Sequence, residues 1–132
     1  MEDWDELLLL PDVAVINLQY GLCEDELLAA EERTGKTIIR WQETDLQNDM
    51  EAVAALSQAL HGVCSVGTAV AQIAGAAGQT TRLVCRKPAW TAIGTHQFQF
   101  CPNIHLVFDE KSNDMQDAVA KCIAQIAALT IN

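Results

Sequence analysis

A turn between an apolar run and a small-residue stretch is the part of this chain best suited to bind a ligand. The segment 65–68 (SVGT) begins within the end of the apolar run 62–66 and leads into an alanine-rich stretch that ends at Gly78. The first amides of a helix have no partner within it, so a helix that begins just past a strand points several N–H groups at one spot. Such a spot suits a phosphate. We predict an anion site at this turn, made by Ser65, Gly67, Thr68 and the amide of Ala69.

The same four residues have a simpler interpretation. Doubly wound proteins contain strand-to-helix turns whether or not a ligand binds there, and a threonine at the first position serves as a helix N-cap. Arg86 and Lys87 raise the same question, since they follow the apolar run 80–85. They are either phosphate contacts at the end of a strand or a solvated basic pair.

Histidine and cysteine offer a second kind of chemistry. His61 and Cys64 are spaced as His-x-x-Cys, and three residues separate Cys101 from His105. Two such half-sites could hold zinc, yet no Cys-x-x-Cys motif accompanies them. We therefore expect buried structural cysteines and no metal. No local signature supports a catalytic cysteine with His96 or His105.

Composition and charge argue against some classes of binding partner. The 132 residues fit one domain, and half of them are apolar. Residues 1–51 hold 14 acids against three basic residues, a net charge of −11, whereas residues 52–132 carry +1. This acidic half repels phosphate backbones, which argues against nucleic-acid binding.

The cysteine count and the length of the apolar runs indicate the cellular compartment of the protein. The five cysteines are odd in number and scattered, which favours the reducing cytoplasm over a disulfide framework. The leucine run 7–10 is too short to span a bilayer, and acids precede it. We expect neither secretion nor membrane insertion.

Strand and helix patterns alternate along the chain and must position these residues. Apolar β-rich runs predict five strands at 13–19, 37–41, 62–66, 80–85 and 104–108. Helical spacing predicts helices at 24–34, 49–60 and 68–77 and from about residue 113 to the end. We expect residues 1–11 to be an acidic leader that forms a short helix, or else the remnant of a linker. The pattern predicts an α/β fold, a three-layer Rossmann-like sandwich at 12–132 with a parallel sheet of order 2-1-3-4-5.

Ligands of such sheets bind at the carboxyl ends of the strands. The loops expected there are 19–23, 65–68 and 86–95, and the 86–103 stretch is long enough to be functional, with one helical turn at most. We expect Trp90 to be buried as an anchor of this loop, with stacking on a nucleobase as the alternative, and Gln72 to face solvent. No Gly-x-Gly-x-x-Gly follows the first strand, so no nicotinamide cofactor is expected.

Four pieces, taken in order, resemble one family. They are LQYG at 18–21, the run 50–66, the block SVGTAVAQIAGAAGQTTRLV at 65–84, and WTAIGT at 90–95 followed by CPNIHLVF at 101–108. Together, over residues 12–131, they resemble the carboxyl-terminal half of bacterial heptosyltransferase-like glycosyltransferases, especially those fused behind tetratricopeptide repeats. That family has the GT-B fold, in which two Rossmann-like domains face each other and the carboxyl-terminal one holds the nucleotide-sugar donor.

The resemblance implies a set of donor-binding residues. The family's Ser-x-Asp-Thr turn falls on Ser65–Thr68, where Thr68 and the next amides would hold the diphosphate. Gln19 and Tyr20 would line the same pocket, and Trp90, Gly94 and Thr95 would frame the donor. Two positions depart from the family: Gly67 stands where it has Asp, and Gln72 stands where it has His.

Two functions follow as expectations. One is a nucleotide-sugar or nucleoside-diphosphate binding domain, inactive alone because the domain with the acceptor site and base is missing. The chain is then an excised fragment or a short natural relic. The other is a non-catalytic interaction module on a degenerate glycosyltransferase scaffold, in which Trp4 and the leucine run 7–10 dock on an upstream domain or a second copy.

Overall fold

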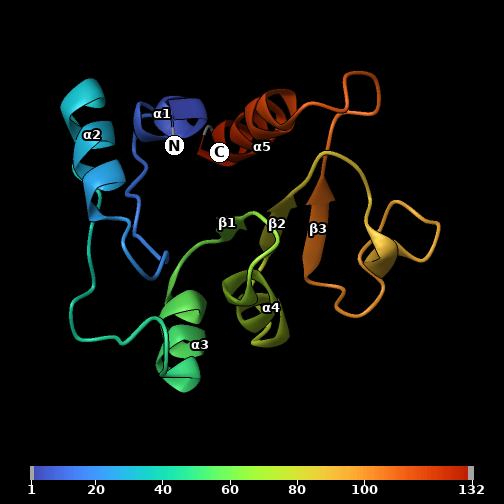
Figure 1. The fold of residues 1–132 in the computed structure, drawn as a ribbon, viewed down its shortest axis with the longest axis horizontal. Coiled ribbons are helices and arrows are strands. Elements are labelled where there is room, and N and C mark those ends of the chain that lie inside the picture. Colours follow the sequence, from blue (N-terminus) through green and yellow to red (C-terminus); the bar gives the residue numbers. More distant parts are fainter. Residues whose placement is uncertain (1, 131–132) are drawn as a thin grey trace.

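The fold is a small parallel sheet with helices on both faces, and a second small core forms from the first 40 residues. The computed structural model describes residues 2–130. Figure 1 shows α5 along one side of the sheet and α4 and α3 on the other. This arrangement confirms the α/β class predicted from the alternating pattern.

The sheet has three parallel strands in the order β1-β2-β3. They are β1 (Val63–Ser65), β2 (Thr81–Val84) and β3 (Ile104–Val107). The central strand β2 pairs with both neighbours, and Arg82 lies between Cys64 and His105 in register. Thr81 is fully buried, as expected for a strand covered on both faces.

Three helices cover the two faces of the sheet. Helix α4 (Ala69–Ala76) packs on all three strands, and α3 (Met50–Ala59) packs beside α4. Helix α5 (Met115–Thr130) crosses the opposite face and packs on β2 and β3. All three helices lie where helical spacing predicted them, and the Asp49 side chain caps α3 by accepting from the Ala52 amide at 2.9 Å.

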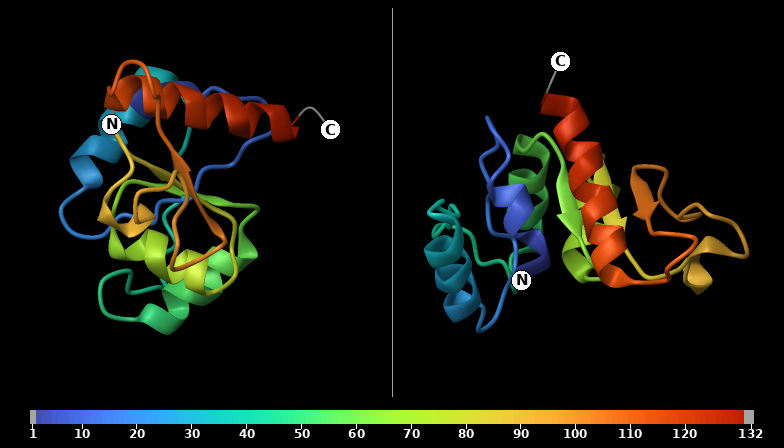
Figure 2. Two further views of the ribbon diagram at one scale, coloured as in Figure 1. Left: turned by 90° about the vertical axis from the view of Figure 1, so that its right-hand side faces the viewer. Right: turned by 90° about the horizontal axis from the view of Figure 1, so that it is seen from above.

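The amino-terminal segment packs on the rest of the chain through short helices. A 3-10 turn η1 (Glu2–Trp4) continues into α1 (Asp5–Leu8), and α2 (Glu24–Thr34) follows after an extended stretch. The η1 turn contacts α5, and α1 contacts α2. Figure 2 shows α2 at the edge of the molecule, away from the sheet.

The leucine run 7–10 is largely covered by its own chain. Leu7 and Leu10 pack with Trp4 against the core under α5. Leu8 is buried in the second core with Leu27, whereas Leu9 is 55% exposed. Three of the four leucines therefore do not need a partner protein to cover them.

Within residues 2–130 the sheet has three strands and not the five that were expected. The stretches 13–19 and 37–41 touch through a single parallel bridge, between Ile16 and Ile39, and neither joins the main sheet. Ile39 is 38% exposed, so one face of this pair is open to solvent, whereas Ile38 on the other face packs against Leu8 and Leu27. β-rich residues form a lasting strand only where a neighbouring strand and a covering layer are both present.

Candidate functional site

The 65–68 turn joins β1 to α4 as the sequence predicted, and its two hydroxyl groups are paired. The Oγ of Ser65 and the Oγ1 of Thr68 lie 2.9 Å apart in a hydrogen bond. Thr68 occupies the N-cap position of α4 in an extended conformation, but its side chain makes no cap hydrogen bond. The threonine thus does not satisfy the first amides of α4 in the way an ordinary N-cap would.

A cavity of about 360 Å³ opens beside this turn. It lies between the start of α4, the ends of β2 and β3, and the loop that follows β2. Ten residues line it: Gly67, Thr68, Gln72, Leu83, Cys85, Ala89, Trp90, Thr91, Phe98 and Leu106. None of them carries an acidic side chain that would repel a phosphate. The cavity is at the carboxyl ends of the strands, where ligands of parallel sheets bind.

Aromatic side chains form the outer wall of this cavity. The ring centroids of Trp90 and Phe100 are 5.9 Å apart, and those of Phe98 and Phe100 are 6.1 Å apart. Phe98 is buried, but Trp90 is 80% exposed and Phe100 is 62% exposed. The expectation that Trp90 is a buried anchor is therefore wrong. Phe98 anchors the loop instead, by packing with Leu83 and Ile104.

The backbone of this loop is strained next to the tryptophan. The 3-10 turn η2 (Trp90–Ala92) ends at Ile93, whose φ is 48°. Left-handed backbone is costly for a β-branched residue, and Ile93 is also 65% exposed. Such strain concentrates at ligand-binding and switch segments.

Several residues assigned to the site lie outside the cavity lining. Gln19, Tyr20, Arg86, Gly94 and Thr95 are exposed and do not line it. Thr95 has a turn role, since its Oγ1 donates to the carbonyl of Ala92 at 2.7 Å. Ser65 and Ala69 flank the turn without lining the cavity. Only Gly67, Thr68 and Trp90 of the predicted set meet around one space.

Sequence reasoning missed most of the cavity wall. Gln72 is exposed, as expected, yet it also borders the opening. Leu83 and Cys85 could have been assigned together, because alternate residues of a strand share one face. Burial raises the pKa of the Cys85 thiol, so this cysteine stays protonated and unreactive at neutral pH. No spacing signal in the sequence marks Phe98.

The cysteines of the two histidine–cysteine half-sites lie on opposite faces of the sheet. Cys64 packs in the core under α5, whereas Cys101 packs in the core beneath α4. Cys64 also sits in an edge strand, where a central one was expected. Within residues 2–130, no three histidine, cysteine, aspartate or glutamate side chains gather closely enough to hold a metal ion.

The length and apolar character of each helix decide whether it could span a membrane. Within residues 2–130, the structure contains no helix with both the length and the apolar character needed to cross a membrane.

Comparison with known proteins gives one relative and no family assignment. The chain is 33% identical over 108 residues to protein FlbA of Caulobacter vibrioides, a match that covers 82% of this chain and 18% of FlbA. The chain therefore spans about a fifth of the length of the curated relative it matches. No protein-family model matches the chain, and no solved structure matches it. What can be said of function therefore rests on the site.

Proposed function

We propose that this domain binds the diphosphate of a nucleotide or nucleotide sugar at the 65–68 turn. The observation that carries the proposal is the position of the cavity, which joins the start of α4 to an exposed tryptophan. The uncapped first amides of α4 supply donors for phosphate oxygens. Trp90 supplies a flat face on which a nucleobase or sugar ring can stack.

The proposal includes the finer architecture implied by the resemblance. The domain would be the donor half of a GT-B glycosyltransferase, inactive without the half that carries the acceptor site and base. The extended stretches 13–19 and 37–41 would then continue the parallel sheet, and Gln19 and Tyr20 would approach the cavity from there. All five cysteines are free thiols, which supports a cytoplasmic location.

Titration with a panel of nucleoside diphosphates tests the proposal, with binding followed by calorimetry and by Trp90 fluorescence. In Thr68→Glu, a carboxylate beside the first amides of α4 should repel the diphosphate and weaken binding at least about tenfold. Thr68→Gln has the same size without the charge, so it should bind more tightly than Thr68→Glu. Ala76→Glu adds the same charge at the far, exposed end of α4 and should bind like the unchanged chain. Absence of binding to every diphosphate at millimolar ligand would exclude the proposed function.

A second function, an interaction module, is favoured by one observation. Trp90, Ile93 and Phe100 are exposed apolar side chains on one loop, and such patches often contact other proteins. Under this alternative, sedimentation would show association that rises with protein concentration and is lost in Trp90→Ser. Under this alternative no diphosphate binds, so diphosphate titrations of the unchanged chain and of Trp90→Ser would both give no binding signal.

A further inference from the structure

The pair formed by the stretches 13–19 and 37–41 is closed on one face and partly open on the other. Ile38 is buried on the closed face, where it packs against residues of α1 and α2. Alternate residues of an extended stretch lie on opposite faces, so Ile39 and Trp41 belong to the open one, which we call the Trp41 face. There Ile39 is 38% exposed and Trp41 is 49% exposed. In α/β folds helices cover both faces of a parallel sheet, and these exposed fractions show that no such layer closes the Trp41 face.

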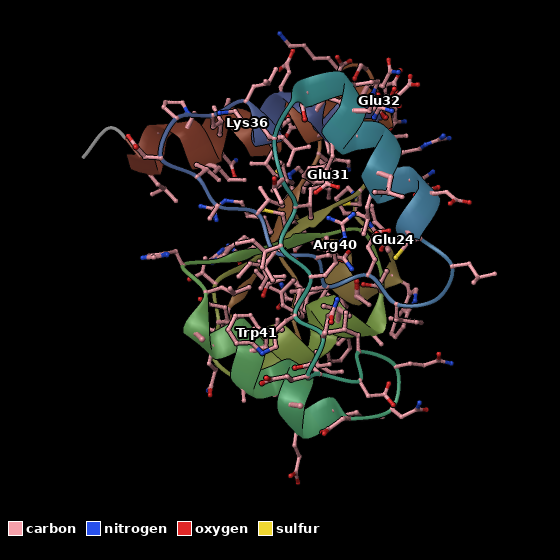
Figure 3. All side chains as sticks on the ribbon, turned by 90° about the vertical axis from the view of Figure 1, so that its left-hand side faces the viewer. Glu24, Glu31, Glu32, Lys36, Arg40 and Trp41 are labelled. Atoms are coloured by element: carbon pink, nitrogen blue, oxygen red, sulfur yellow. The ribbon has the colours of Figure 1, made fainter. Side chains whose placement is uncertain are left out.

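The cation next to Trp41 in the sequence is used on the closed side. The Arg40 guanidinium lies 2.6 Å from Glu31 and 2.9 Å from Glu24, and both carboxylates are on α2. Figure 3 shows Arg40 directed toward these two carboxylates and Trp41 directed away from them. The charge of Arg40 is therefore compensated at α2 and does not neutralise acids on the side of Trp41.

The chain that follows Trp41 is acidic and contains no lysine or arginine as far as residue 81. Its four carboxylates are the exposed side chains of Glu43, Asp45, Asp49 and Glu51, which give this stretch a net charge of −4. In the described part of the chain, residues 2–130, none of the four forms an ion pair. The Trp41 face thus leads directly into a set of uncompensated negative charges, which attract basic side chains.

We propose that the Trp41 face binds an amphipathic helix of a partner protein, apolar along one side and rich in lysine or arginine along the other. The apolar side covers Ile39 and Trp41 and supplies the helical layer that this face lacks. The basic side chains meet the carboxylates of the 43–51 segment, so the charge of the chain fixes the charge of the partner. Tryptophan is enriched among the residues that contribute most to binding between proteins. The proposal is independent of the diphosphate site, because neither Ile39 nor Trp41 lines the cavity beside the 65–68 turn.

A designed peptide tests the proposal on the whole chain. The peptide is a helix of about 18 residues, or five turns, with leucine on one side and lysine on the other. A matched peptide has the same leucines and glutamate in place of each lysine. The titrations are followed by NMR of the ¹⁵N-labelled chain, in which the indole N–H groups of Trp4, Trp41 and Trp90 give three separate signals.

We expect the leucine–lysine peptide to shift the Trp41 indole signal and to leave those of Trp4 and Trp90 in place. The leucine–glutamate peptide should not bind, because the 43–51 segment repels it. Raising the salt concentration from about 0.05 to 0.5 M should weaken binding of the leucine–lysine peptide at least about tenfold, since salt screens the attraction between charges.

Matched variants separate the Trp41 face from the general acidity of the chain. Trp41→Ser should weaken binding at least about tenfold, whereas Trp90→Ser should bind like the unchanged chain. Glu43→Gln, two residues from Trp41, should weaken binding about two- to fivefold at low salt. Glu26→Gln removes the same charge from an exposed position on α2 and should have little effect. Circular dichroism checks that each variant is folded, and if Trp41→Ser is not, the Trp41 signal and the glutamate pair decide.

Four results would overturn the proposal. The first is that the Trp41 signal stays in place at millimolar leucine–lysine peptide, or that the Trp90 or Trp4 signal moves instead. The second is equal weakening by Glu43→Gln and Glu26→Gln, which would mean that net charge alone attracts the peptide. The third is equal binding of the leucine–glutamate peptide. The fourth is a dimer of the chain alone that Trp41→Ser abolishes in sedimentation, which would make a second copy the occupant of this face.

Discussion

Gly67 leaves open space at the position where the glycosyltransferases that this sequence resembles have an aspartate. A Cβ built at this position meets no atom within 4 Å, and its φ is outside the left-handed region. The glycine is thus not required by its own backbone, and an aspartate fits without strain. An aspartate here would add a carboxylate to the turn without changing its backbone.

We expect Gly67→Asp to change ligand preference and to leave the fold intact. A carboxylate accepts hydrogen bonds from donor hydroxyls, but it repels a diphosphate. Binding of a bare nucleoside diphosphate should stay the same or weaken, while binding of the matching nucleotide sugar should improve. Calorimetric titration of both ligands checks this, with Gly67→Ala as the uncharged control. If Gly67→Asp leaves both affinities unaltered, the turn is not part of the binding pocket.

Gly75, unlike Gly67, has no space for a side chain, because α4 contacts β3 at this position. A Cβ at Gly75 would overlap the Cγ1 of Ile104 and lie 3.2 Å from the Sγ of Cys101. The clash involves the Cγ1 methylene of a buried side chain, which has no room to swing away. It outweighs the roughly 1 kcal/mol that alanine gains over glycine within a helix.

Gly75→Ala should therefore destabilise the fold by about 1–3 kcal/mol. Urea unfolding monitored by circular dichroism measures this loss. Gly67→Ala, at a glycine with open space around it, should change the unfolding free energy by less than about 0.5 kcal/mol. Equal stabilities of the two variants would show that α4 and β3 are packed less closely than the structure has them.

At the scale of elements, a charged network fastens α2 to the extended stretch that follows it. The Arg40 guanidinium contacts Glu31 at 2.6 Å and Glu24 at 2.9 Å. Glu31 also accepts from the Ile38 amide at 2.6 Å. Figure 3 shows the three charged side chains meeting between α2 and this stretch. The network holds Ile38, whose buried side chain belongs to the second core.

This network makes part of the stability depend on pH. The hydrogen bonds from Arg40 and from the Ile38 amide lower the pKa of Glu31. Because the folded pKa is below the unfolded one, the contribution is complete above the unfolded pKa and is lost as the pH falls through the folded value.

Glu31→Gln should lower the free energy of unfolding at neutral pH, and its difference from the unchanged chain should shrink in acid. Urea unfolding at about pH 7 and about pH 3 measures both differences. Glu32→Gln, at the exposed neighbouring position on α2, is the control and should have little effect at either pH. A Glu31→Gln deficit that is the same at both pH values would mean that the charge on Glu31 does not contribute.

At the scale of the whole molecule, the two cores differ in how well they shield their hydrogen bonds. The Thr81 amide donates to Asn103 and the Cys85 amide to Val107, at 2.9 and 3.0 Å. The Asn17 amide donates to Ile39 and the Ile39 amide to Val15, both at 2.9 Å. The lengths are alike, but helices cover both faces of β2, whereas the Ile16–Ile39 bridge is open to solvent at Ile39.

Hydrogen exchange should therefore separate the two sets of amides. The Thr81 and Cys85 amides should exchange at least about tenfold more slowly than those of Asn17 and Ile39, because buried strands open only with the whole fold. Exchange followed by NMR at neutral pH measures each amide. Equal protection of both sets would mean that the amino-terminal core unfolds together with the sheet, as one cooperative unit.

The sequence by itself determined the local elements. Helical spacing located α2, α3, α4 and α5, Gly35 marked the end of α2, and the three buried apolar runs became β1, β2 and β3. These predictions succeed because periodicity and end signals act within a few residues. The 65–68 turn was predicted for the same reason, since it depends only on a strand being followed by a helix.

Only the tertiary structure decided which side chains of those elements are buried, exposed or in contact. The runs 13–19 and 37–41 have strand-like residues, yet they pair with each other through one bridge and pack on α1 and α2, outside the sheet. Trp90 is exposed because Phe98, eight residues later, fills the core in its place. Cys64 and Cys122 pack in the same core, beneath α5, although nothing near either one in the sequence indicates it. Burial and contact between distant segments follow from packing the whole chain, and no local pattern contains that information.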